Sequence, residues 1–180
     1  MSTFDNLIDL DGNGRPIYGD SPFRVSKSVT FDGDDETVAT PIFTVVGEVM
    51  VTRIWGVVTT ALGASHTDAH WRVNDQTATD QIITKATTLD LGSISAGAMI
   101  FKSGLITAVA TYKTSDAGSV YEPTTLQTGV FTPFMVVQKK GGIQTDIEYV
   151  YTTAGAETTG VMDFFVSYYP LSPTSYIAAS

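Results

Sequence analysis

The chain has 180 residues, of which 43% are hydrophobic and 16% charged, so it can bury a core and is too apolar to be disordered. Its 19 acidic and 10 basic residues give a net charge of −9, which argues against contacts with nucleic acid or an anionic membrane. The absence of cysteine excludes disulfides, thiol chemistry and cysteine-based zinc sites. The 27 threonines, which suit a pleated and half-exposed surface, predict an all-β protein.

The first 24 residues differ in composition from the rest of the chain. They hold two acidic, glycine-rich turns and two prolines, and their apolar residues are isolated, which is too broken a pattern for a strand or a helix. This predicts an extended arm at residues 1–24 and one sandwich domain at residues 25–180. The arm lacks the features of a secretory signal, so we expect a soluble protein made in the cytoplasm. The arm residues that we expect to contact a partner are Phe4, Leu7, Ile8 and Phe23.

Within the arm, the stretch DLDGNGRPIYGD at residues 9–20 has the spacing of a twelve-residue calcium loop. Such a loop lies between two helices in an EF-hand, and the flanks FDNLI and SPFRV are too short and too broken for helices. Pro16 stands at the eighth position, where it supplies no backbone N–H. We interpret the stretch as two turns, with calcium binding through a non-helical loop as the alternative. The residues at loop positions 1, 3, 5, 6 and 12 are Asp9, Asp11, Asn13, Gly14 and Asp20.

From Arg24 onward, runs rich in Val, Ile and Thr are separated by turn residues at the spacing of a β-sandwich. No window has a sustained helical period. The sequence therefore predicts an all-β, two-sheet β-sandwich that is jelly-roll-like, with the extended N-terminal arm. The predicted strands lie at 24–31, within 41–62, and at 66–74, 79–87, 97–104, 104–114, 131–140, 143–153 and 161–170.

Three local patterns refine this outline. Alternation along residues 48–58 places Val51 and Trp55 on one face, and both faces are largely apolar, which predicts a strand buried between two layers. The residues KKGG at 139–142 predict a β-hairpin, because Gly supplies the positive φ of primed turns. The tail PLSPTSYIAAS follows the last predicted strand, and we expect a partner to cover its apolar side chains.

No group of residues predicts a catalytic or metal site. His66 and His70 are four positions apart, which on a helix would offer two ligands to one metal ion, but this segment is predicted to be a strand. There the two rings would share a face about 13 Å apart, too far for one ion. The chain has no GxSxG motif, and GDDE at 33–36 is interpreted as a solvated turn. We therefore expect no enzyme activity and no cofactor.

The aromatic residues are predicted to lie in the core or at a subunit interface, with stacking on sugars as the alternative. The residues concerned are Trp55, Trp71, Tyr149, Tyr151, Phe164, Phe165, Tyr168 and Tyr169.

Two blocks of the sequence resemble small virion proteins of tailed bacteriophages. The first block, residues 29–62, has a strand ending in FDG, an acidic loop, and a run of the form FTVxGxVxVxxxxGVxTT. The second, residues 161–180, is an aromatic strand that ends in a Pro-Leu-Ser turn and small residues. Residues 75–160 form a longer middle region than this pattern implies. The matching positions are Phe43, Thr44, Val45, Gly47, Val49, Val51, Gly56, Val57, Thr59, Thr60, Phe164, Tyr168, Pro170, Leu171 and Ser172.

The resemblance implies a structural protein of the virion, made in the host cytoplasm. Such a capsid cement or decoration protein binds the outer surface of an assembled phage head, and its partners would be the major capsid protein and two further copies of itself in a homotrimer. The alternative is a fibre or baseplate module that recognises host surface glycans. A glycan-binding module would place exposed aromatic residues in a groove beside acids and amides, whereas a cement protein would bury them at subunit contacts.

Overall fold

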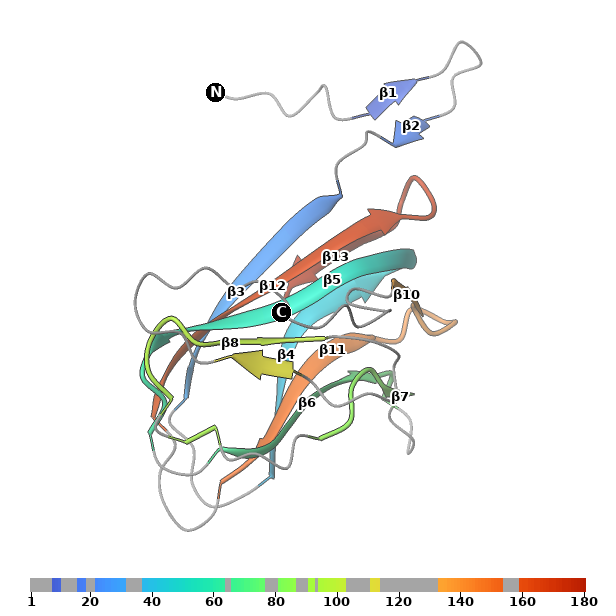
Figure 1. Ribbon diagram of the computed structural model, residues 1–180. Coiled ribbons are helices and arrows are strands. Elements are labelled where there is room, and N and C mark those ends of the chain that lie inside the picture. The colour runs from blue at the N-terminus through green and yellow to red at the C-terminus, as the bar shows by residue number, and fades with distance from the viewer. Residues whose placement is uncertain are drawn as a thin grey trace.

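The computed structural model describes residues 8–10, 16–18, 22–31, 37–63, 66–76, 81–86, 91–92, 94–102, 111–113, 133–153 and 159–180. Within these ranges, two antiparallel sheets share one core, and a separate two-stranded sheet lies near the N-terminus (Figure 1). This confirms the predicted all-β, two-sheet sandwich. Every element in the described ranges is a strand, so they contain no helix long and apolar enough to cross a membrane.

The two large sheets have six and five strands. The first sheet has the order β3-β12-β5-β8-β9. The strands β8 and β10 pair with different parts of β5: β10 pairs with residues 48–51 and β8 with residues 55–57. The second sheet has the order β13-β4-β11-β6-β7. The jelly-roll connectivity stays a prediction. The first sheet contains β3 (Phe23–Phe31), β5 (Glu48–Thr60), β8 (Met99–Phe101), β9 (Thr111–Lys113), β10 (Phe134–Val137) and β12 (Gly160–Pro170). The second contains β4 (Thr37–Val46), β6 (Thr67–Asn74), β7 (Gln81–Ile82), β11 (Asp146–Thr152) and β13 (Tyr176–Ala179).

The core lies between the inner faces of these two sheets. Successive side chains of a strand point to opposite faces, so every second residue of β11 and β12 enters the core. Burying one large apolar side chain stabilises a fold by roughly 1.5 to 3 kcal/mol. The largest fully buried side chains include Trp71, Tyr149, Phe43, Phe164, Ile42 and Ile54.

A β-bulge in β5 changes which side chains face the core. One extra residue, Thr52, interrupts the pairing of β5 with β12. Val51 before the bulge and Ile54 after it are both buried in the core, and Trp55 therefore lies on the outer face. The prediction that Val51 and Trp55 share a face was wrong, because an extra residue shifts the alternation. The outer side chains of β5 are half-buried or exposed, not fully buried as predicted.

The turn at residues 139–142 connects the two sheets instead of forming a hairpin. Gly141 and Gly142 have φ values of 92° and 72°, which confirms the predicted left-handed backbone. However, β10 pairs with β5 in the first sheet, whereas β11 pairs with β4 and β6 in the second. The predicted hairpin was wrong, because turn residues determine a local bend and not the sheet that the next strand joins.

The C-terminal tail belongs to the sandwich. Its strand β13 pairs with β4, and Ile177 is buried in the core. The hydroxyl of Ser175 accepts a hydrogen bond of 2.8 Å from the backbone N–H of Glu48. The prediction that this tail needs a partner to cover its apolar side chains was therefore wrong for Ile177, whereas Leu171 and Tyr176 stay 40% and 49% exposed. The single chain itself supplies the strand on which the tail packs.

The N-terminal two-stranded sheet consists of β1 (Ile8–Leu10) and β2 (Pro16–Tyr18), and among the described strands these two pair only with each other. The prediction that this stretch is too broken for strands was wrong. Residues 11–15 lie outside the described ranges, so the interpretation of the possible calcium loop stays a prediction. The next strand, β3, begins at Phe23, two residues before the predicted start of the domain.

Candidate interaction surfaces

A histidine lies in the middle of the core. His66 is fully buried, its Nε2 atom is 2.9 Å from the hydroxyl of Tyr149, and its ring stacks on Tyr151 with centroids 4.3 Å apart. Burial raises the pKa of Tyr149 far above its ordinary value of 10.0, and the neighbouring Tyr151 raises it further. The phenol therefore stays neutral and hydrogen-bonded. The contact between the two side chains links β11 to the segment that leads into β6.

The two histidines face opposite sides of the second sheet. Asp68 has a φ of 57°, and β6 carries an extra residue opposite β11 at this point. This bulge turns His66 into the core, whereas His70 pairs with Val150 on the outer face. The prediction that the two share a face was wrong because of the bulge. No group of three or more possible metal ligands occurs among the described residues.

The outer face of the second sheet is polar, and its buried carboxylates are hydrogen-bonded. Glu148 accepts a hydrogen bond of 2.7 Å from Arg72 Nε and one of 2.9 Å from Asn74 Nδ2. Asp146 accepts one of 2.7 Å from the hydroxyl of Thr44. Both acids are almost fully buried, at 4% and 2% exposure, so these partners offset the desolvation of their charges. This face is closed and offers little to a ligand.

The outer face of the first sheet carries a stack of aromatic rings and an arginine. Trp55 of β5 and Phe165 of β12 are cross-strand neighbours, with ring centroids 5.2 Å apart and planes inclined by 19°. The guanidinium carbon of Arg24 lies 5.3 Å and 4.5 Å from the two ring centres. We call these three residues the aromatic-arginine face. Both rings are half-buried, so part of their surface faces solvent. Arg and Trp are enriched at the centres of protein interfaces.

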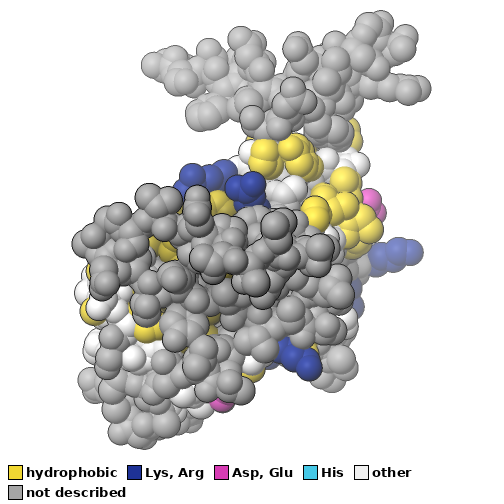
Figure 2. Space-filling model, in the orientation of Figure 1, with side chains coloured by type: hydrophobic (Ala, Val, Ile, Leu, Met, Phe, Trp, Pro, Cys, Tyr) yellow, Lys and Arg dark blue, Asp and Glu magenta, His cyan; other side chains and the backbone are white. Residues whose placement is uncertain are grey.

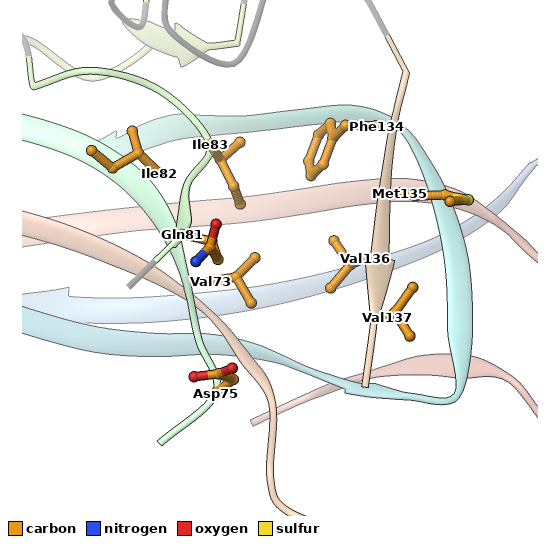
Figure 3. A pocket seen from close by; sticks show the side chains of 9 residues that line it. All are labelled: Val73, Asp75, Gln81, Ile82, Ile83, Phe134, Met135, Val136 and Val137. Atoms are coloured by element: carbon orange, nitrogen blue, oxygen red, sulfur yellow. The ribbon is translucent and has the colours of Figure 1, made fainter. Parts of the chain in front are cut away.

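A second surface is an apolar groove at the open side of the sandwich, between β7 and β10 (Figure 3). Its volume is about 380 Å³. The side chains of Ile83, Phe134 and Val136 point into it from both sheets in Figure 3. Its two polar side chains are Asp75 and Gln81. We call it the edge groove, and it is lined by Val73, Asp75, Gln81, Ile82, Ile83, Phe134, Met135, Val136 and Val137.

The edge groove concentrates apolar side chains that the fold leaves exposed. Ile82, Met135 and Val137 are 55%, 59% and 52% exposed, and they are three of the six large hydrophobic residues exposed within the described ranges. Elsewhere, Figure 2 shows hydrophobic side chains gathered next to Lys and Arg side chains on the viewed face. Clustered apolar exposure of this kind marks contact sites more often than single exposed residues do.

Two lysines lie at the edge groove. Lys139 Nζ donates a hydrogen bond of 3.4 Å to the backbone carbonyl of Asp75, and Lys102 Nζ lies 5.4 Å from the ring centre of Phe134. Burial lowers the pKa of Lys102 below its ordinary value of 10.5. The groove thus has two lysines beside it, one of them almost fully buried, and one carboxylate, Asp75, in its lining.

The structure places the four predicted arm residues differently. Phe4 and Leu7 lie outside the described residues, and Ile8 is the first residue of β1. Phe23 is the first residue of β3, where its ring lies 5.7 Å from that of Tyr168 and packs against the core of its own chain. The structure therefore does not bring the four together into one described surface.

The aromatic residues divide between the core and the outer face of the first sheet. Half-buried side chains remain at Trp55, Phe165 and Tyr169, and the two rings of the aromatic-arginine face belong to this set. The other five aromatic residues are buried in the core, as predicted, and they are Trp71, Tyr149, Tyr151, Phe164 and Tyr168.

Sequence reasoning missed the edge groove. The signal is the run Phe134 to Val137, in which both alternating sets of side chains are apolar although the strand is only four residues long. A short strand with two apolar faces is either covered on both sides or lies at an exposed edge. The sequence does not distinguish these cases, because the position of β10 depends on its pairing with β5 more than 80 residues earlier.

No protein-family model, no curated protein and no solved structure matches the chain.

Proposed function

We propose that this protein is a capsid cement or decoration protein that binds the outer surface of an assembled tailed-phage head as a homotrimer and stabilises the head. The observation that carries the proposal is the aromatic-arginine face. Its two rings come from β5 and β12, the neighbouring strands within the two sequence blocks that resemble virion proteins, and Arg24 comes from β3, outside both blocks. A sheet face with two half-buried rings and an arginine suits contact with another protein surface.

The geometry of the stack favours a protein partner over a sugar. A sugar binds an aromatic residue by lying on the ring face, and Arg24 already lies over Phe165 with its guanidinium carbon 4.5 Å from the ring centre. A sugar would have to displace this cation. An acidic side chain of a partner protein can instead pair with Arg24 while apolar residues contact the edges of the rings. We expect the complementary patch on the major capsid protein to be acidic and apolar.

The second candidate is a fibre or baseplate module that binds host glycans. One observation favours it: the edge groove holds an acid, Asp75, and an amide, Gln81, near the aromatic ring of Phe134. This is the combination that sequence reasoning expects for a sugar site. The remaining lining of the groove is aliphatic or Met, which offers a sugar few hydrogen bonds, so we rank this candidate second.

The test is co-sedimentation with phage heads that lack the protein. We expect the wild type to sediment with the heads, and Arg24→Glu to bind about tenfold more weakly or worse because it reverses the charge at the centre of the contact. The control is Lys85→Glu, an exposed position with the same change of charge. Failure of the wild type to bind heads would contradict the proposal, and so would equal binding by both variants. Binding of the wild type to host surface polysaccharide but not to heads would support the second candidate.

A further inference from the structure

We propose that the edge groove binds the N-terminal arm of a second copy of this chain, which adds as a strand beside β10. This inference concerns self-association and does not rest on the proposed role at the capsid. It depends on four features of the molecule: the open strand edges at the groove, the unsupported sheet in the arm, the charges of both, and the length of the connecting chain.

Within the described residues, the edge groove has an unpaired strand edge on each side. β10 pairs with β5 and β7 pairs with β6, and in the described part of the chain no strand pairs with the remaining edge of either. Such an edge presents a row of N–H and C=O groups that can pair with an incoming strand. Because Ile82, Met135 and Val137 are exposed at the same place, an added strand would satisfy main-chain groups and cover apolar surface together.

The N-terminal arm is a suitable strand to add. Its strands β1 and β2 form a sheet of only two strands, and an isolated sheet of this size is marginally stable in water. Joining β10 would make it part of a larger sheet. In an extended FDNLIDL segment, Phe4, Asn6, Ile8 and Leu10 would fall on one face, and Asp5, Leu7 and Asp9 on the other. The first, mainly apolar set matches the interior of the groove.

The charges of the arm and the groove are complementary. Residues 1–22 contain four aspartates and one arginine, so the arm is acidic. Lys139 lies at the groove and is bonded to the backbone of Asp75, whose carboxylate belongs to the lining, while Lys102 lies against Phe134 and is only 4% exposed. Lys140 follows on the exposed turn. An arm strand with its apolar face in the groove would place its aspartates near these ammonium groups.

The length of the connecting chain favours a second copy over the chain's own arm. The strand register aligns Phe23 of β3 with Phe134 of β10 across β12 and β5. If β1 pairs with β10 and β2 stays paired with β1, β2 lies five strand spacings of about 4.8 Å, or about 24 Å, from β3. The chain from Tyr18 to Phe23 spans about 17 Å when fully extended. The arm therefore falls short of the groove of its own chain but can reach a neighbour packed beside it.

This contact joins two different surfaces, so each copy gives one arm and receives another. A contact of this kind closes into a ring when the rotation between copies allows it. A closed ring of three copies would be the homotrimer that we propose on the capsid, although the arm contact itself is independent of the capsid.

The test uses the full-length chain in sedimentation velocity experiments over a range of concentrations. The groove variant is Val137→Lys, and the arm variant is Ile8→Lys combined with Leu10→Lys. The control is Leu171→Lys, which changes a comparably exposed apolar residue, 40% exposed, outside the groove lining. We expect the wild type and the control to associate, and both other variants to have dissociation constants at least about tenfold higher. Unchanged melting temperatures establish that each variant is folded.

Mixing the groove variant with the arm variant gives the decisive result. The mixture contains one intact arm and one intact groove, so we expect it to form a heterodimer although each variant alone is monomeric. The proposal is overturned if the wild type stays monomeric, if the arm variant associates like the wild type, or if the mixture does not associate. A monomeric wild type whose β10 amides lose protection from hydrogen exchange only in the arm variant would place the arm in its own groove, which also overturns the proposal.

Discussion

The outer faces of the two sheets carry different chemistry on the same kind of backbone. On the second sheet, Glu148 is buried and held by Arg72 and Asn74, so the polar groups of that face bind one another. On the first sheet, Arg24 lies over two half-buried rings, and the pair of rings faces solvent. Each face has an arginine, but Arg72 is bound to a carboxylate and Arg24 lies over aromatic rings.

This difference suggests that the outer face of the second sheet contributes to stability and that of the first sheet to binding. A buried carboxylate that loses its partner remains charged and desolvated, which destabilises the folded state. A partly exposed cation over aromatic rings contributes little to the fold and stays available to a partner. The second sheet should therefore respond to mutation mainly through stability, and the first mainly through binding.

Replacement of the arginine on the second sheet should have the largest effect. Arg72→Ala leaves Glu148 buried without its cationic partner, and we expect the free energy of unfolding to fall by about 2–3 kcal/mol. Chemical denaturation followed by circular dichroism measures this loss. Replacing both partners, Arg72→Met with Glu148→Leu, should recover part of it because no unpaired charge remains. A loss below about 0.5 kcal/mol for Arg72→Ala, typical of an unimportant surface site, would show that this face is not closed by the pair.

A substitution on the inner side of the same sheet should reduce the free energy of unfolding by a smaller amount. Tyr149→Phe removes the hydroxyl that lies 2.9 Å from His66 Nε2, and we expect a loss of about 1–2 kcal/mol because a buried ring nitrogen loses a partner. Tyr176→Phe, at an exposed position, is the control and should leave stability unchanged. Denaturant titrations of both variants at neutral pH give the comparison.

The same variant has a predicted dependence on pH. The pKa of Tyr149 is raised in the folded protein, so below pH about 10 this phenol is protonated in both the folded and unfolded states. Above that pH only the unfolded state loses this proton, and stability falls as pH rises. Tyr149→Phe should show a shallower decline between pH 10 and about 11 than the wild type. An identical decline in both proteins would contradict the assignment.

The fold class was predictable because it depends on local composition. Thr, Val and Ile runs separated by turns determine where strands form, and β3, β6 and β12 lie within two residues of their predicted bounds. The errors arose where one extra residue in a strand changes which face of the sheet the following side chains occupy. An extra residue in β5 and another in β6 reversed the faces of Trp55 and His66, and a bulge has no signal in an alternating apolar pattern.

The candidate surfaces were less predictable because they depend on which strands become neighbours. Trp55 and Phe165 are more than 100 residues apart in sequence, and only the pairing of β5 with β12 brings their rings together. The same holds for the edge groove, where Ile83 and Val136 come from different sheets. The C-terminal tail is the opposite case. Its sequence predicted exposed apolar side chains, yet Ile177 is buried because β13 pairs with β4.

The smallest change in stability is expected for the arginine on the first sheet. Arg24→Ala removes a cation from the solvent-facing side of Trp55 and Phe165, and we expect a loss below about 1 kcal/mol, in the range of exposed cation–π contacts. Acrylamide should quench the fluorescence of Trp55 more strongly in this variant, whereas fully buried Trp71 should stay protected; Trp55→Phe assigns the signal. Lys85→Ala is the matched control. If Arg24→Ala destabilises the fold as much as Arg72→Ala does, the first sheet also depends on its arginine for stability, and the proposed division between a stabilising face and a binding face is wrong.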